Sequence, residues 1–348
     1  MKKINYGKHT IDESDIESVV SALKSENLTQ GPLIESFERA LGEKFCAKYV
    51  CATSNGTAAL HLSGIALGWS EGDIVITTAL TFIASINSIL YCNATPDLVD
   101  IDLKTYCINL DSLENKLKKY QMIGKKVSAV IAVDFAGQPC QWEELSKLSE
   151  KYDFKLINDN CHAIGASYKN DLGYGVKFAD IVTHSYHPVK NITTGEGGAI
   201  LTNDKKIFDK VKLLRSHNID RECNKTKNQG AWHYDVTQLG YNYRLNDLQC
   251  ALGISQLKRL DRFVKSRNDI ADIYRDHFKD CDKYILPNQN NYSDHAYHLF
   301  PIRINFLETK IQRTSLFEKM KELGINLQVH YIPIYKHHYI KDKYIFNM

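Results

Sequence analysis

Polar side chains that could carry chemistry stand directly after short apolar runs of this 348-residue chain. Asp159 and His162 follow one such run, and Lys190 lies in a polar, glycine-rich loop between two others. A carboxylate, an imidazole and an amine can move protons to and from a bound substrate. Each also has a plainer explanation: Lys190 as a surface charge, Asp159 as a helix cap and His162 as a satisfied polar residue. Taken singly, none of the three decides between these explanations.

A phosphate site is indicated by Thr53–Leu60, a stretch of small and hydroxylic residues that opens a predicted helix. The first turn of a helix has free amides and the positive end of the helix dipole, so it can bind an anion. Thr57 and the amide of Ala58 are the predicted donors, with an ordinary Ser/Asn helix cap as the alternative. Phe82 is either an aromatic wall of the same site or a core side chain. Glycine-rich nucleotide-binding motifs and a Walker lysine do not occur in the sequence.

The elements that would position these residues alternate between strand and helix. The expected strands are Lys48–Ala52, Asp73–Thr77, Asp97–Asp100, Val127–Val133, Phe154–Ile157, Asp180–Thr183 and Ala199–Thr202. The expected helices are Asp12–Lys24, Leu33–Leu41, Thr57–Leu67, Ala84–Tyr91, Leu110–Lys119 and Trp142–Lys151. This alternation predicts an α/β fold with a mostly parallel sheet and helices on both faces. Ligands of such sheets bind beyond the carboxyl ends of the strands, so the candidate residues are expected along one edge.

The pattern changes near residue 246. A long amphipathic stretch is followed by an Asn-rich loop and by a short strand–helix–strand pattern. These elements are Leu248–Phe278, His298–Asn305, Gln312–Leu323 and Asn326–His330. We therefore predict a large α/β domain over residues 1–245, with an N-terminal arm over 1–32, and a smaller α+β domain over 246–348.

Composition narrows the class of protein. The chain is 43% hydrophobic and 24% charged, which is typical of a globular protein, and its net charge of +3 does not favour nucleic acid or membrane partners. Nine cysteines, an odd number without Cys-x-x-Cys spacing, predict reduced thiols in a cytoplasmic protein. Neither a signal peptide nor an apolar run of about 20 residues is expected. His330, His337 and His338 lack a suitable further ligand, so no metal site is predicted.

Five motifs in chain order resemble the pyridoxal-phosphate-dependent sugar aminotransferases of the DegT/DnrJ/EryC/StrS type. They are Leu28–Pro32, Ser54–Leu60, Asp159–Gly165, Ser185–Gly198 and Leu239–Asp247, so the resemblance runs nearly from end to end. It implies the aspartate-aminotransferase-like fold, with pyridoxal 5'-phosphate as cofactor. It also implies a nucleotide-linked keto-sugar and L-glutamate as substrates, and a homodimer with shared active sites.

The resemblance also assigns roles. Lys190 matches the catalytic lysine that holds the cofactor as a Schiff base and then moves a proton. Asp159 matches the carboxylate that keeps the pyridine nitrogen protonated, and Phe82 the aromatic ring that stacks on the cofactor. His162, where many relatives have glutamine, is expected beside the phenolic oxygen.

Further contacts are implied around the phosphate and the substrate. Thr57, Ala58 and Ser185 match the phosphate cup, which Asn242 of a partner chain completes. The implied substrate contacts are Thr29, Gln30, His330 and Tyr331.

Within the family, four features are most similar to members that act at C4 of a UDP-linked 4-keto-6-deoxy-N-acetylhexosamine. They are His162, Arg215–His217, Ile192–Gly198 and Gln328–Tyr335. Such members serve the synthesis of pseudaminic acid and related surface sugars, with glutamate as amino donor. Relatives usually continue some tens of residues further, so a truncated small domain is expected here.

Three other functions share parts of this pattern. A sugar 3-dehydratase of the same fold carries histidine in place of the lysine, so Lys190 argues against it. An aminotransferase acting at C3 or C4 of a dTDP- or GDP-sugar is only weakly distinguished by the sequence. A non-catalytic cofactor-binding protein would be recognised by cofactor binding without turnover of glutamate.

Overall fold

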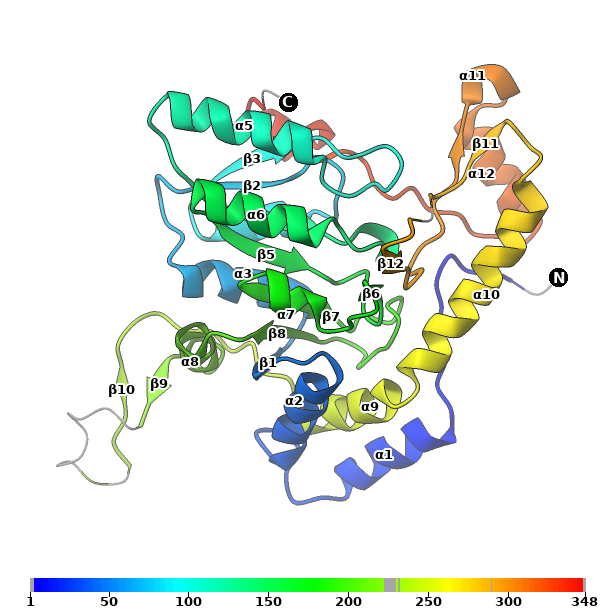
Figure 1. Ribbon diagram of the computed structural model, residues 1–348. Helices are drawn as coiled ribbons and strands as arrows, with labels where there is room; N and C mark the ends of the chain where they lie inside the picture. Colours follow the sequence, from blue (N-terminus) through cyan, green and yellow to red (C-terminus); the bar gives the residue numbers. More distant parts are fainter. Residues whose placement is uncertain (1–2, 222–229, 231, 289, 347–348) are drawn as a thin grey trace.

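A seven-stranded sheet forms the centre of the computed structural model, which describes residues 3–221, 230, 232–288 and 290–346 (Figure 1). Its strands are β1 (Tyr49–Thr53), β2 (Ile74–Thr78), β3 (Thr95–Val99), β4 (Val127–Val133), β5 (Lys155–Asp159), β7 (Ile181–Ser185) and β8 (Gly198–Thr202). Their order is β1-β8-β7-β5-β4-β2-β3, and only β8 runs antiparallel to its neighbours. The predicted α/β fold with a mostly parallel sheet is therefore confirmed.

The carboxyl ends of six strands meet at one edge of this sheet. Because β8 is antiparallel to both β1 and β7, these two strands are parallel to each other and to the rest. The register places Thr53 and Ser185 on either side of Gly198, and Asp159 beside Thr183. The sheet thus brings residues that are more than a hundred positions apart to the same edge.

Helices cover both faces. One face carries α3 (Gly56–Leu67), α4 (Ala84–Tyr91) and α8 (Lys205–Leu214). The other carries α2 (Pro32–Lys44), α5 (Leu110–Met122), α6 (Trp142–Tyr152), α7 (Tyr174–Phe178) and α9 (Asp247–Leu257). Side chains alternate between the faces along each strand: Ile131 of β4 packs towards α3, while Val130 packs towards α5 and α6.

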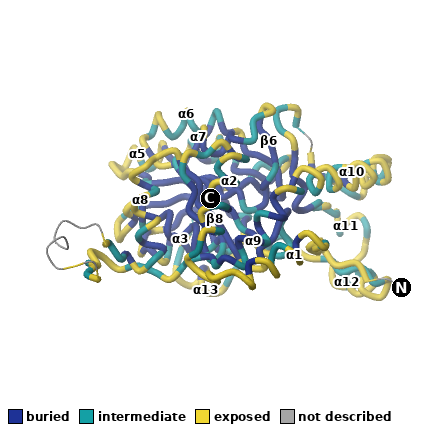
Figure 2. Tube along the Cα trace, turned by 90° about the horizontal axis from the view of Figure 1, so that it is seen from below, coloured by how far each residue is buried: buried dark blue, intermediate teal, exposed yellow. Residues whose placement is uncertain are grey.

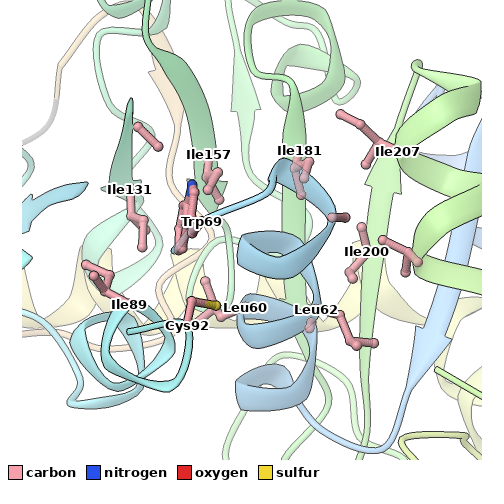
Figure 3. Packing of buried hydrophobic residues seen from close by; sticks show 14 of the residues in the cluster. Leu60, Leu62, Trp69, Ile89, Cys92, Ile131, Ile157, Ile181, Ile200 and Ile207 are labelled. Carbon is pink, nitrogen blue, oxygen red and sulfur yellow. The ribbon is translucent and has the colours of Figure 1, made fainter. Parts of the chain in front are cut away.

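The layer between the sheet and α3 is a continuous apolar core. Figure 3 shows Ile131, Ile157, Ile181 and Ile200, one from each of four strands, facing the helix that carries Leu60 and Leu62. All of these side chains are almost completely buried. Burial of this kind contributes about 25 cal/mol per Å² of apolar surface, so it fixes α3 firmly against the sheet.

Local signals set the helix boundaries. The Asn55 side chain accepts the amide of Ala58 at the start of α3, and Gly68, with φ of +84°, ends that helix in the left-handed conformation. Asn246 and Gln249 form a capping box at the start of α9. None of the described helices is long and apolar enough to span a membrane. Eight cysteines are free thiols, and the ninth, Cys223, lies outside the described residues.

The predicted amphipathic stretch over Leu248–Phe278 is two helices. α9 packs against α1 (Glu13–Leu23) and α2, whereas α10 (Leu260–Phe278) extends away from the sheet (Figure 1). At its far end lie α11 (Phe306–Thr309), α12 (Arg313–Glu322), β11 (Tyr284–Ile285) and β13 (Arg303–Ile304). Figure 2 shows the dense burial around the sheet and the largely exposed α10 and α12. The division into domains at residue 245 stays a prediction.

Of two strands expected near the C-terminus, one is much shorter than predicted and the other is absent from the described residues. Of His298–Asn305, only Arg303–Ile304 is strand; the amide of Leu299 donates instead to the carbonyl of Ala136 at 3.1 Å. Asn326–His330 is not strand either, since the described backbone around it pairs with Ile4 alone. In both stretches the backbone groups are used by irregular contacts with the rest of the molecule, which alternation of side chains does not reveal.

The segment after residue 330 returns to the large sheet. It contains the short helices η2 (Ile334–Lys336) and α13 (His338–Lys341). Ile334 and Ile340 are buried against Ile86 of α4 and Leu98 of β3. This cluster fixes the position of Tyr331, which precedes it.

Candidate active site

A cavity of about 730 Å³ opens at the edge where the strands end. Its walls come from the starts of α3 and α4, the ends of β5 and β7, the loop Tyr186–Gly197 (the lysine loop) and Tyr331. Eight predicted site residues line it: Thr57, Ala58, Phe82, Asp159, His162, Ser185, Lys190 and Tyr331. The cavity therefore gathers chemistry-bearing residues that are separated by up to 274 positions in the sequence.

Asp159 is the last residue of β5 and is only 5% exposed. Its Oδ2 accepts a hydrogen bond from Oγ of Ser85 at 2.9 Å, and its Oδ1 accepts one from the amide of Cys161 at 3.3 Å. Ser85 lies in the first turn of α4, and its Oγ is 3.1 Å from Oγ1 of Thr81. The carboxylate is thus held in one orientation at the floor of the cavity.

Lys190 is positioned by the lysine loop, which joins β7 to β8. Thr193 closes the loop, since its Oγ1 donates to the carbonyl of Tyr186 at 2.9 Å, and the amide of Lys190 donates to the carbonyl of His187 at 2.8 Å. Burial lowers the pKa of the lysine amine, and the negative charge of Asp159 opposes part of this shift. An amine with a lowered pKa is more readily available as a nucleophile and base.

The start of α3 lies against the end of β7. A Cβ on Gly56 would stand 2.8 Å from Cβ of Ser185, so a larger residue at position 56 would push the helix away. The amide of Ala58, predicted to donate to the phosphate, donates to the Asn55 side chain at 2.8 Å, and its role at the phosphate stays a prediction. First-turn amides have no partner within a helix, so those of Gly56 and Thr57 are the donors left for an anion.

His162, 4% exposed, connects the cavity floor to the C-terminal segment. Its Nδ1 accepts the amide of Ala136 at 3.3 Å, so Nε2 carries the proton and donates to the hydroxyl of Tyr331 at 3.1 Å. Burial, then the nearby Lys190 charge, holds the pKa of His162 well below its ordinary value. The ring is therefore neutral at physiological pH. Phe82, 52% exposed, stands with its ring centroid 5.9 Å from that of Tyr331.

Four predicted site residues do not line the cavity. Thr29 and Gln30 are exposed in the turn before α2, where Asp247 accepts the amide of Gly31 at 2.9 Å and holds the turn against α9. Asn242 is exposed and pairs with Ser216. His330 lies beside the cavity, where burial and then Lys190 lower its pKa.

Other lining residues were not predicted. Cys161 lines the cavity near both Asp159 and Lys190. His61 also lines it, with the rings of Tyr91 and Tyr243 at 5.2 Å and 6.0 Å from its own, centroid to centroid. The sequence around Ser85 did not indicate a role in the site, because Ser85 lies within an ordinary helical pattern and contacts Asp159 only in the folded protein. Cys161 lies inside the motif Asp159–Gly165, and its position two residues after the strand end was the available signal.

These groups fit one cofactor. Lys190 offers an amine without a hydrogen-bond partner among the described residues, Asp159 a buried carboxylate, and α3 an anion-binding end that only glycine at position 56 permits. Amine, carboxylate and phosphate cup are what pyridoxal phosphate requires of a protein. The fold and the cavity together define a pyridoxal-phosphate-dependent aminotransferase.

Comparisons with known proteins support this assignment. The sequence profile of the DegT/DnrJ/EryC1/StrS aminotransferase family matches residues 9–346. A Campylobacter jejuni protein named UDP-4-amino-4,6-dideoxy-N-acetyl-beta-L-altrosamine transaminase is 40% identical over 339 residues, covering 97% of this chain and 86% of that protein. GDP-perosamine synthase of Escherichia coli O157:H7 is 34% identical over 344 residues, 98% and 89% of the two chains.

Solved structures are also similar. Helicobacter pylori PseC, described as an aminotransferase involved in the biosynthesis of pseudoaminic acid, has a TM-score of 0.88 and 31% identity, covering 99% of this chain and 88% of that one. A putative sugar aminotransferase of Streptococcus pneumoniae in its PLP form has a TM-score of 0.87 and 26% identity, covering 99% and 89%. This chain belongs to the DegT/DnrJ/EryC1/StrS aminotransferase family.

Proposed function

We propose that this enzyme transfers the amino group of L-glutamate to C4 of a UDP-linked 4-keto-6-deoxy-N-acetylhexosamine, in the synthesis of pseudaminic acid or a related surface sugar. The observation that carries this proposal is the 40% identity, over 97% of the chain, to a transaminase named for a UDP-linked 4-amino-4,6-dideoxy-N-acetyl sugar. A second Campylobacter jejuni protein of the same name, 39% identical over 341 residues, supports it.

Lys190 is the proposed catalytic residue that binds the cofactor covalently and carries the proton. When bound, pyridoxal phosphate supplies an electron sink for the carbon whose C–H bond breaks. The lowered pKa of the Lys190 amine favours its neutral form, which can accept the proton from one carbon and return it to another. Lys190 and Asp159 line the same cavity and are close enough for the Asp159 charge to act on the amine, so both residues would contact one bound cofactor.

Asp159 is proposed to keep a proton on the ring nitrogen of the cofactor. Ser85 and the Cys161 amide fix the carboxylate, so it needs no reorientation. His162, whose Nε2 donates to the Tyr331 hydroxyl, is proposed to lie beside the phenolic oxygen of the cofactor, and Phe82 is proposed to stack on the cofactor ring.

The phosphate is proposed to bind at the start of α3, to Gly56, Thr57 and Ser185. Asn242 is exposed and outside its own chain's cavity, which fits a residue that completes the phosphate site of a second copy. We therefore propose a homodimer with shared active sites. Thr29 and Gln30 are likewise outside the cavity of their own chain, so their proposed sugar contacts belong to the partner's site.

The acceptor is tested by supplying glutamate and keto-sugars linked to UDP, dTDP or GDP. We expect the UDP-linked 4-keto-6-deoxy-N-acetylhexosamine to be converted most efficiently, and NMR of the product to show the new amine at C4. The competing nucleotides serve as the control. A clear preference for a GDP- or dTDP-sugar, or amination at C3, would contradict the proposed substrate while leaving the aminotransferase assignment unchanged.

A second prediction concerns Ser85. Ser85→Ala removes the hydrogen bond to Oδ2 of Asp159, and we expect kcat to fall about tenfold, the value of one hydrogen bond to a charged group of about 1.5 kcal/mol. Ser85→Thr keeps the hydroxyl and should recover most of the rate. Ser88→Ala is the matched control, because Ser88 is equally buried in α4 but donates only to the carbonyl of Ser85. Equal losses in Ser85→Ala and Ser88→Ala would show that the effect is structural.

A further inference from the structure

The lysine loop is tied to two other segments by the side chain of Asn191, the residue after Lys190. Nδ2 of Asn191 donates to the carbonyl of Ile164 at 2.9 Å and to the carbonyl of Ala296 at 3.1 Å. Neither carbonyl accepts another hydrogen bond among the described residues. Asn191 is 6% exposed, so water does not replace these bonds easily. One amide group therefore joins three stretches of chain that are far apart in the sequence.

Both acceptors belong to backbone that the fold holds in place. Ile164 is 1% exposed and is buried in the core that the sheet forms with α2 and α9. The amide of Ala296 donates to the carbonyl of Gly137 at 2.9 Å, and Asn268 of α10 donates to the carbonyl of the residue before Ala296, also at 2.9 Å. Asn191 thus fastens the lysine loop to the segment after β5 and, through residues 295–296, to α10.

The asparagine is present although half of its amide group is unfavourably placed. Its Oδ1 is buried and has no donor among the described residues. A buried acceptor without a partner destabilises a protein, and a leucine of similar shape would avoid it. The presence of asparagine is therefore explained better by the two bonds that Nδ2 donates than by packing.

Lys190 is the residue whose position these bonds control. The planar peptide bond fixes the spacing between its Cα and that of Asn191, so a shift of one moves the other. The amide of Lys190 also donates to the carbonyl of His187 at 2.8 Å. The backbone of Lys190 is held from both sides, and its side chain lines the cavity.

We propose that Asn191 is a positioning residue: by holding the lysine loop to the segment after β5 and to α10, it places the amine of Lys190 against the cofactor. This inference rests on the proposed role of Lys190. In covalent attachment, the amine nitrogen bonds to the aldehyde carbon of pyridoxal phosphate, and the aldehyde oxygen leaves as water. Such a step needs close approach of nitrogen and carbon, and a misplacement of about 1 Å can slow it about a hundredfold.

The test compares covalent with non-covalent binding in the full-length protein after removal of the cofactor. Pyridoxal phosphate is mixed in rapidly, visible absorbance follows the attachment, and borohydride trapping with mass spectrometry locates it on the peptide containing Lys190. Asn191→Leu keeps the size and branching of the side chain but donates no hydrogen bond, so we expect attachment to slow about tenfold to a hundredfold. Pyridoxamine phosphate has no aldehyde, and its dissociation constant should be unchanged.

Controls distinguish this role from a structural one. Asn203 also holds two backbone groups, the carbonyl of Val176 and the amide of Lys48, each at 3.0 Å, but at the end of β8 away from the lysine loop. Asn203→Ala should lower the melting temperature and leave the attachment rate unchanged. Asn191→Ala is a second variant, in case the leucine prevents folding, and should also slow attachment.

Three results would overturn the inference. They are attachment at the wild-type rate in the folded Asn191 variant, equal slowing in Asn203→Ala, and a loss of pyridoxamine phosphate affinity as large as the loss in attachment rate. The proposed role of Lys190 fails in a different way: if the wild-type protein carries the cofactor on another peptide, or does not attach it at all, both proposals are overturned.

Discussion

Lys190→Ala is expected to lose covalent attachment of pyridoxal phosphate and to lower turnover by about a thousandfold or more. The reason is that this amine both binds the cofactor and carries the proton, and other described lysines do not line the cavity. Borohydride reduction followed by peptide mass spectrometry checks the first point: the wild-type peptide containing Lys190 should gain the mass of the cofactor, and the variant peptide should not.

Lys205→Ala is the control, because Lys205 is an exposed lysine paired with Asp209 on α8. It should keep both cofactor attachment and turnover. Cofactor mass on a different peptide of the wild-type enzyme would show that the wrong lysine has been assigned.

Lys190 is also expected to lower the stability of the cofactor-free protein. Burial lowers the pKa of Lys190 in the folded protein below its value of 10.5 in an unfolded chain, so the charged form disfavours folding. This penalty is fully present below the folded pKa and disappears as pH rises towards the unfolded pKa. In the cofactor-free protein, Lys190→Met, which keeps an unbranched side chain of nearly the same length, should therefore melt at a higher temperature near pH 7. The difference should shrink as pH approaches 10.

Much of the central sheet and of the helices on its faces could be predicted because the signals for these elements are local. The run Val127–Val133 is a strand with the bounds predicted, and Ala84–Tyr91 is a helix with the bounds predicted. Burial on both faces makes such strands apolar throughout, and their ends mark the edge where ligands bind. Asp159 was singled out for this reason, since it directly follows a strand, whereas Ser185 and the role of Lys190 came from the resemblance to the family.

What could not be predicted depends on contacts between distant segments. Nothing near Ser85 in the sequence indicates a bond to Asp159, and nothing near Asn191 indicates a bond to Ala296, 105 positions away. The sequence also does not say that the Asn55 cap accepts the amide of Ala58, a contact that only the folded helix start shows. The strands expected around residues 298–305 and 326–330 failed because their backbone partners lie in other parts of the fold.

Asp159→Asn is expected to retain the cofactor on Lys190 and to lower kcat by roughly a hundredfold to ten-thousandfold, the range for a positioned proton-transfer group. Asparagine keeps the shape of the side chain, but it has no charge with which to hold a proton on the ring nitrogen. The retained attachment follows because the lysine and the phosphate site at the start of α3 are not altered. The visible spectrum and the rate of the glutamate half-reaction measure the two effects separately.

Asp134→Asn is the matched control, since Asp134 is also a buried aspartate just beyond a strand end, yet it does not line the cavity. Its carboxylate accepts hydrogen bonds from Trp142 Nε1 at 3.0 Å and from the Tyr174 hydroxyl at 2.7 Å. Losing acceptors there leaves buried donors unsatisfied and should cost about 1–3 kcal/mol of stability while the half-reaction keeps its rate. Asp159→Asn should instead slow the glutamate half-reaction and leave the stability of the protein nearly unchanged. An Asp159→Asn enzyme with a normal glutamate half-reaction would mean that another carboxylate holds the proton, because a charge that can be removed without slowing the reaction cannot be stabilising its transition state.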